Sequence, residues 1–160
     1  MSDKDLQRLT ACVSDIGQPF SHRALPSRRT HITQKTRLAN QRTLYISVHA
    51  DPASAELFLR VKGADCTPEI IGLYDVTARL MSVALQYGAS LEKLGDLLTG
   101  AQFAPRGPVS RHDRLKHCSS VPDLIGLHLL VEYCGRGDLA PGSVPLQEGA
   151  RAMISGVNRV

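Results

Sequence analysis

Hydrophobic and polar residues alternate along three consecutive segments between residues 32 and 62, which predicts three β-strands. Turn-forming residues separate these segments at 39–42 and at 51–54. Short turns of this kind join neighbouring antiparallel strands, so the sequence predicts a three-stranded antiparallel meander. One face of the expected sheet carries Ile32, Gln34, Thr36, Leu38, Leu44, Ile46, Val48, Leu57, Leu59 and Val61.

Beyond residue 68 the apolar residues recur every three to four positions, which predicts helices. We expect these helices at about 69–87, 90–99 and 120–134, with Ser90 and Ser120 as N-caps. Three helices beside a meander indicate an α+β fold with a single core. This core is expected to contain Leu44, Ile46, Val48, Leu57, Leu59 and Val61 from the strands, and Ile70, Leu73, Leu80, Met81, Leu94, Leu97, Leu124 and Leu127 from the helices.

The chain divides into three parts. Residues 1–21 form an N-terminal segment, with a short helix expected at 3–13. Residues 22–135 form the folded domain, which begins with an extended arm at 22–30. Glycine, proline and serine dominate the sequence that follows, so we expect residues 136–160 to be a flexible tail.

Composition narrows the class of protein. A length of 160 residues with 42% hydrophobic and 21% charged residues fits one soluble domain. No stretch approaches the roughly 18 consecutive apolar residues of a membrane-spanning helix, and the first residues do not resemble a signal peptide. We therefore expect a cytoplasmic protein without membrane contact. The four cysteines match no zinc-ligand spacing, and no nucleophile or phosphate-loop motif is present, so neither a metal site nor a catalytic residue is assigned.

Positive charge is unevenly distributed along this chain of net charge +4. No acidic residue occurs between Asp15 and Asp51, and a second basic stretch covers 104–116. Arginine and lysine attract phosphate, which predicts an anion- or nucleotide-binding site. A solvated surface whose acidic partners lie elsewhere in the fold would give the same pattern. The candidate residues are Arg28, Arg29, Lys35, Arg106, Arg111, Arg114 and Lys116.

The extended arm at 22–30 would form one side of this anion-binding site. Arg28 and Arg29 are adjacent on an extended segment, so their side chains point to opposite sides. We expect one of them to pair with an acid such as Asp75 or Glu56. The arm would then pack over the sheet and complete an anion-binding groove with the loop at 104–116. The alternative is an arm held only by scattered surface contacts.

Two aromatic residues, Tyr45 and Phe58, fall on the strand face opposite the aliphatic one. We expect helices to cover this face, which would make both of them core residues. If the face is open instead, aromatic rings beside arginine and lysine could stack bases, as single-strand-binding proteins do.

Six segments follow one another along the chain: HRALPSRRTHITQK (22–35), TLYISV (43–48), a strand ending at KG (62–63), LMSVALQYGASLEKLGDLL (80–98), FAPRGPV (103–109) and SSVPDLIGLHL (119–129). Together they resemble the TSCPD-type C-terminal accessory domain of adenosylcobalamin-dependent (class II) ribonucleotide reductases. The resemblance covers about residues 22–134, roughly seven-tenths of the chain.

The resemblance implies an accessory role without catalysis by this chain alone. The family's catalytic barrel, with its thiyl cysteine and cobalamin site, needs a much longer chain. The name-giving motif aligns with Ser119–Asp123, where Val121 stands in the place of the cysteine. The cysteine pair that family tails often carry is missing from 135–160. The implied function is a stand-alone module in deoxyribonucleotide supply that docks on, or regulates, a separate reductase large chain, with adenosylcobalamin bound by that chain.

Two other functions stay open at this point. A basic nucleotide- or single-stranded nucleic-acid-binding protein would use the arm and the 104–116 loop, and its affinity would fall steeply with added salt. The other is a domain that serves only homo-oligomerisation. The sequence does not distinguish this function from that of an accessory module.

Overall fold

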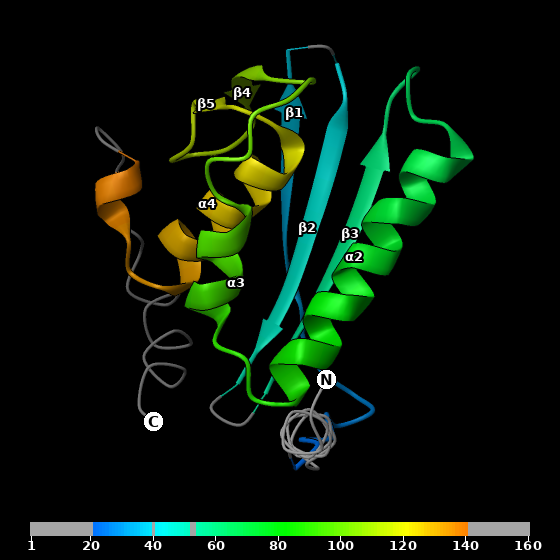
Figure 1. Ribbon diagram of the computed structural model, residues 1–160, viewed down its shortest axis with the longest axis vertical. Coiled ribbons are helices and arrows are strands. Elements are labelled where there is room, and N and C mark those ends of the chain that lie inside the picture. Colours follow the sequence, from blue (N-terminus) through cyan, green and yellow to red (C-terminus); the bar gives the residue numbers. More distant parts are fainter. Residues whose placement is uncertain (1–20, 40, 52–53, 141–160) are drawn as a thin grey trace, which may run out of the picture.

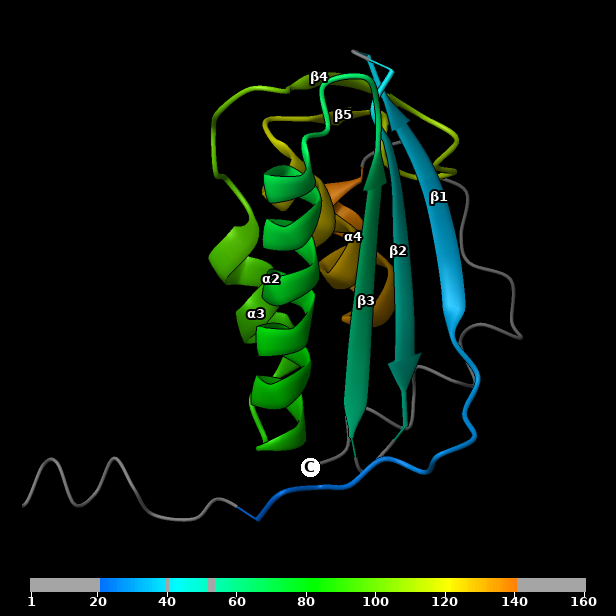
Figure 2. The same cartoon turned by 90° about the vertical axis from the view of Figure 1, so that its right-hand side faces the viewer.

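The computed structural model describes residues 21–39, 41–51 and 54–140. These residues contain one antiparallel sheet and the helices. The described strands are β1 (Ile32–Leu38), β2 (Thr43–Ala50), β3 (Ala55–Lys62), β4 (Gly107–Ser110) and β5 (His117–Cys118). The described helices are α2 (Pro68–Gln86), α3 (Leu91–Leu98), α4 (Val121–Tyr133) and the short 3₁₀-helix η1 (Gly137–Leu139). The strand order is β3-β2-β1-β4-β5, and the helices lie on one side of β1–β3 (Figures 1 and 2).

The expected α+β class is confirmed, but the expected number of strands is wrong. The meander of β1, β2 and β3 forms with its predicted antiparallel pairing. The predicted sheet lacks β4 and β5, which extend the observed sheet beyond β1. These strands have four and two residues, and β4 contains Gly107 and Pro108. Strands this short show no measurable alternation, and their pairing depends on neighbours far away in the sequence.

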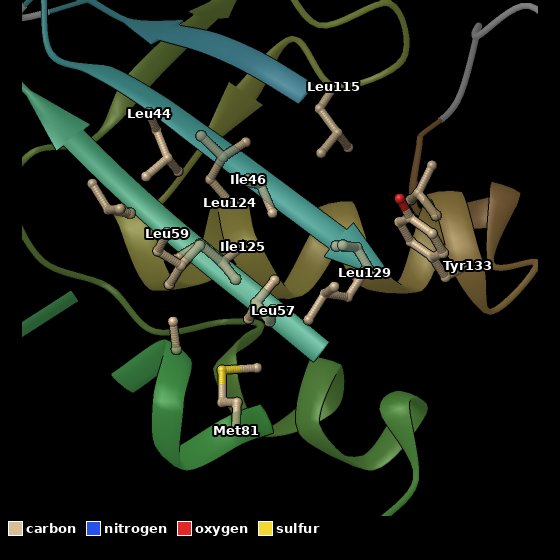
Figure 3. Packing of buried hydrophobic residues seen from close by; sticks show 14 of the residues in the cluster. Leu44, Ile46, Leu57, Leu59, Met81, Leu115, Leu124, Ile125, Leu129 and Tyr133 are labelled. Atoms are coloured by element: carbon tan, nitrogen blue, oxygen red, sulfur yellow. The ribbon is translucent and has the colours of Figure 1, made fainter. Parts of the chain in front are cut away.

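The core lies between the sheet and the helices α2 and α4 (Figure 3). Leu44, Ile46 and Leu57 from the inner face of the sheet are fully buried. They pack in one cluster with apolar residues of α4, and α3 packs closely against α4. Because α4 is enclosed by its neighbours, it has no polar face. Its buried side chains are Val121, Asp123, Leu124, Ile125, His128, Leu129, Leu130, Val131 and Tyr133.

Helix α2 faces the sheet with a side that only partly matches the expected one: Met81 is buried and Ile70 packs against the core as expected, but Leu73 and Leu80 do not. The side against β3 carries small residues, Ala78 and Ser82, which let the helix approach the strand closely. The Ser82 hydroxyl accepts from the Leu57 N–H at 2.9 Å and lies 3.0 Å from the Leu57 carbonyl oxygen. The assignment of Leu73 and Leu80 to the core is therefore wrong, because both are exposed. Leu97 of α3, also expected in the core, is exposed as well.

Both ends of the chain extend past the described residues. The helix expected at 3–13 lies outside them, as do residues 141–160 of the expected tail. The described part of that tail, 136–140, contains η1, which packs against α4, and ends at the buried Ala140.

Candidate functional site

The motif at Ser119–Asp123 forms the start of α4. The Ser120 hydroxyl accepts a hydrogen bond from the Asp123 N–H at 3.0 Å, which confirms the predicted N-cap. The Asp123 carboxylate accepts from the N–H groups of Gly100 at 2.8 Å and Ser119 at 2.7 Å. Val121 is fully buried in the core. The motif therefore ties the end of α3 to the start of α4.

Helices α3 and α4 approach each other through two glycines. A Cβ atom at Gly126 would lie 2.6 Å from both the Gly95 carbonyl oxygen and the Thr99 Oγ1. A Cβ atom at Gly95 would lie 2.8 Å from the Leu130 Cγ. Contacts this short do not occur in folded proteins, so the approach of the two helices requires glycine at both positions.

Two buried histidines contact each other, His112 of the 104–116 loop and His128 of α4. His112 Nδ1 accepts from the backbone N–H groups of Arg114 and Leu115, so its proton is on Nε2. That nitrogen lies 3.1 Å from His128 Nδ1, which therefore accepts. Burial lowers the pKa of His112 to about 4 and that of His128 to about 3, so both rings are neutral at pH 7. Within the described residues no group of three or more His, Cys, Asp or Glu could hold a metal ion.

The outer face of the sheet is open and positively charged. Lys35 of β1 pairs with Tyr45 of β2, which pairs with Arg60 of β3. The neighbouring rows add Phe58 and Lys62 on the same face. The Lys35 and Lys62 Nζ atoms lie 5.5 and 5.9 Å from the Tyr45 ring centre, within cation–π range. We call this surface the open sheet face: Lys35, Arg37, Tyr45, Phe58, Arg60 and Lys62.

The assignment of Tyr45 and Phe58 to the core is therefore wrong. Phe58 is 45% exposed and Tyr45 is half-buried. The described α-helices α2, α3 and α4 pack on the other side of β1–β3, because that side carries the continuous aliphatic surface (Figure 2).

Glu56 contacts the C-terminal part of the arm at one end of the sheet. The Arg29 Nε donates to its Oε2, and His31 Nε2 lies 3.2 Å from the same oxygen. This is one of the two pairings expected for Arg28 or Arg29. The Arg29 hydrogen bond holds the pKa of the Glu56 carboxyl below its ordinary value. Arg28 is exposed.

The other predicted anion-site residues lie at several separate places. In the 104–116 loop, Arg114 donates to the Val131 carbonyl at 2.7 Å, and Lys116 donates to the His112 carbonyl at 2.8 Å. Arg106 and Arg111 are exposed. The arm precedes Ile32, whereas β4 pairs with β1 at Arg37 and Leu38, so the arm and β4 meet opposite ends of β1 (Figure 2).

Lys35 is the predicted candidate that lies on the open sheet face, and sequence reasoning missed its neighbours there. Arg37, Arg60 and Lys62 occupy the strand positions that alternate with the buried aliphatic ones. Grouping the basic residues by strand face, instead of by density along the chain, would have found them.

The molecule is thus an α+β domain with a one-sided sheet, an open basic face and a capped, enclosed helix α4. The TSCPD domain family matches residues 19–133. The chain belongs to this family, as the resemblance predicted.

Curated relatives carry the domain within much longer chains. A "Vitamin B12-dependent ribonucleotide reductase" of Bradyrhizobium diazoefficiens is 30% identical over 118 residues, and one of Agrobacterium fabrum is 31% identical over 117 residues. Each alignment covers 72% of this chain and 9% of the relative. A reductase of the same name from Rhodopirellula baltica is 28% identical over 120 residues, 74% of this chain and 11% of its own. No solved structure gives a significant match.

The buried pair of His112 and His128 does not fit the cofactor in the relatives' names. His112 bonds to His128 through Nε2 and accepts from backbone at Nδ1, whereas His128 Nε2 is buried without a hydrogen-bond partner in a core filled by aliphatic side chains. No corrinoid contact is therefore assigned to this domain. None of the helices in the described residues has the length and apolar character needed to cross a membrane.

Proposed function

We propose that this chain is an accessory module that acts in deoxyribonucleotide supply together with a separately encoded ribonucleotide reductase catalytic chain. One observation carries the proposal: the chain matches reductases over 72% of its own length but over only 9% of theirs. The catalytic residues and the adenosylcobalamin site would then belong to the partner chain. A radical reaction needs a closed, water-free site, which fits a large catalytic chain better than this domain.

Affinity capture tests this function. The tagged chain, added to a native lysate of the cells that produce it, should retain the reductase large chain, identified by mass spectrometry. The purified chain alone, supplied with ribonucleotide, adenosylcobalamin and a dithiol, should form no deoxyribonucleotide. Absence of the large chain from the captured fraction, or turnover by the isolated chain, would contradict the proposal.

The open sheet face favours a second candidate, binding of a nucleotide or single-stranded nucleic acid. Lys35, Arg37, Arg60 and Lys62 surround two exposed or half-exposed rings. In single-strand-binding proteins, cations contact the phosphates while bases stack on aromatic rings. Glu56, the one acidic side chain on this face of the described strands, is neutralised by Arg29.

A matched pair of charge reversals tests this second candidate. Arg60→Glu with Lys62→Glu changes the open sheet face, and Arg106→Glu with Arg111→Glu makes the same charge change in the exposed loop. With a fluorescent single-stranded DNA oligonucleotide, the first variant should lose at least tenfold in affinity and the second should keep it. Wild-type affinity should fall steeply between two salt concentrations. No wild-type binding at low salt, or equal losses in both variants, rules this candidate out.

A further inference from the structure

Helix α2 exposes a continuous apolar stripe on the side away from the sheet. Leu73, Val76, Leu80 and Val83 are 44–66% exposed, although each is a large aliphatic side chain. Their spacing of three, four and three residues is that of the seam of a two-helix coiled coil. The stripe follows α2 for most of its length. Contiguous apolar surfaces of this kind are usually covered by another element.

The first described residues of the chain lie at one end of this stripe. The Arg23 N–H donates to the Gln86 carbonyl at 2.9 Å, and the His22 ring lies 5.1 Å from the Tyr87 ring. His22 Nε2 also lies 2.9 Å from the Gln86 Oε1. Three contacts therefore fix residues 22–23 at the C-terminal end of α2, next to the last residues of the stripe.

The segment that precedes this anchor carries a matching pattern. Leu6, Leu9, Val13 and Ile16 repeat the spacing of three, four and three residues. Gly17 and Pro19 follow, which are residues that typically end a helix. A helix from Leu6 to Ile16 would be about 15 Å long at 1.5 Å per residue, the same length as the stripe from Leu73 to Val83.

We propose that the N-terminal segment, residues 3–16, forms a helix that lies parallel to α2 and covers its apolar stripe. Leu6, Leu9, Val13 and Ile16 would meet Leu73, Val76, Leu80 and Val83 in order. The connection is long enough, because five residues lie between Ile16 and the anchored His22 and an extended chain spans about 3.3 Å per residue. Val83 lies only four residues, about 6 Å along the helix axis, from Tyr87.

Tethering favours this segment over a second copy of the chain as the occupant. A short connection keeps the segment at an effective concentration in the millimolar range, far above that of another molecule in dilute solution. A helix of this length is marginal when isolated, so contact with the stripe would also be what stabilises it. The proposal is independent of the proposed function, because it concerns contacts within one chain.

Disulfide trapping in the full chain tests the proposal. Val13→Cys with Leu80→Cys places two thiols across the expected seam, whereas Ala11→Cys with Leu80→Cys places one on the far side of the same helix. Both variants carry Cys12→Ser, and in both the bond would join the same two tryptic peptides, 9–23 and 80–93. With oxidised glutathione at low protein concentration, the first pair should link within one chain at least tenfold faster than the second. Equal rates, no bond at 13–80, or a bond between two chains would overturn the proposal.

Hydrogen exchange gives a readout that needs no cysteine. Amides of residues 6–16 should be protected in the wild type, and Leu80→Lys should reduce this protection at least tenfold. Leu97→Lys, which changes an exposed leucine on α3, is the matched control and should leave it unchanged. Absence of protection in the wild type, or the same protection in both variants, would overturn the proposal.

Discussion

Replacing Gly126 by alanine tests how closely α3 and α4 must pack. The added Cβ would lie 2.6 Å from the Gly95 carbonyl oxygen and from the Thr99 Oγ1, and 2.8 Å from the Thr99 N. Two of these atoms belong to the backbone of α3 and its C-cap, so α3 has to move away as a unit. Overpacking of this kind costs about 1–3 kcal/mol, of which the better helix propensity of alanine returns up to about 1 kcal/mol. We expect Gly126→Ala to lose roughly 1–2 kcal/mol of unfolding free energy.

Gly72→Ala is the matched control. Gly72 lies within α2, and nothing surrounds the position of a Cβ within 4 Å. This variant should gain about 0.5–1 kcal/mol from helix propensity alone. Urea titration measures the change in unfolding free energy for each variant, provided that the slope of this free energy against urea concentration is the same as in the wild type. Equal effects in the two variants, or a stable Gly126→Ala, would refute the packing argument.

Three further predictions concern the core. Burial lowers the pKa values of both buried histidines, so the unfolded chain binds more protons than the folded one below pH 6.5. The free energy of unfolding should therefore be highest above pH 6.5 and should fall by roughly 2–4 kcal/mol between pH 7 and 5, as measured by urea titration. A free energy of unfolding that does not change with pH would contradict the buried pair. Leu59→Asp would bury an unpaired charge and cost several kcal/mol, so an unchanged melting temperature would contradict the strand assignment. Ser120→Ala should cost about 0.5–2 kcal/mol through loss of the α4 N-cap, measured by thermal melting, and no loss would show that the cap contributes nothing.

The elements that the sequence predicted well are those with local signals. The alternation in β2 and β3 and the caps Ser90 and Ser120 place these elements within one or two residues of their observed bounds. The orientation of α2 could not be predicted, because this helix is apolar on two sides. Its buried side combines Met81 and Leu85 with the small residues Ala78 and Ser82, whose small size matters once β3 lies beside them.

The candidate site shows the same limit. Alternation separates the two faces of a sheet, and the helices cover the aliphatic one; the exposure of Phe58 was missed because helices were expected on the opposite face as well. Residues such as Arg114 and Lys116 are close in sequence, yet their backbone partners come from the tertiary fold. The pairing of Arg29 with Glu56 could be predicted as one of two alternatives, because few acidic residues lie close enough to an extended arm.

Direct binding between purified components tests the central claim, that this chain serves a reductase catalytic chain. The measurement is the titration of this chain into the adenosylcobalamin-dependent catalytic chain from the same cells, followed by calorimetry and by reductase turnover. Our account predicts saturable binding with a Kd of about 10 µM or tighter, equivalent to about 7 kcal/mol, and a change in turnover that saturates at the same ratio. No heat and no change in turnover at roughly tenfold higher concentration would contradict it.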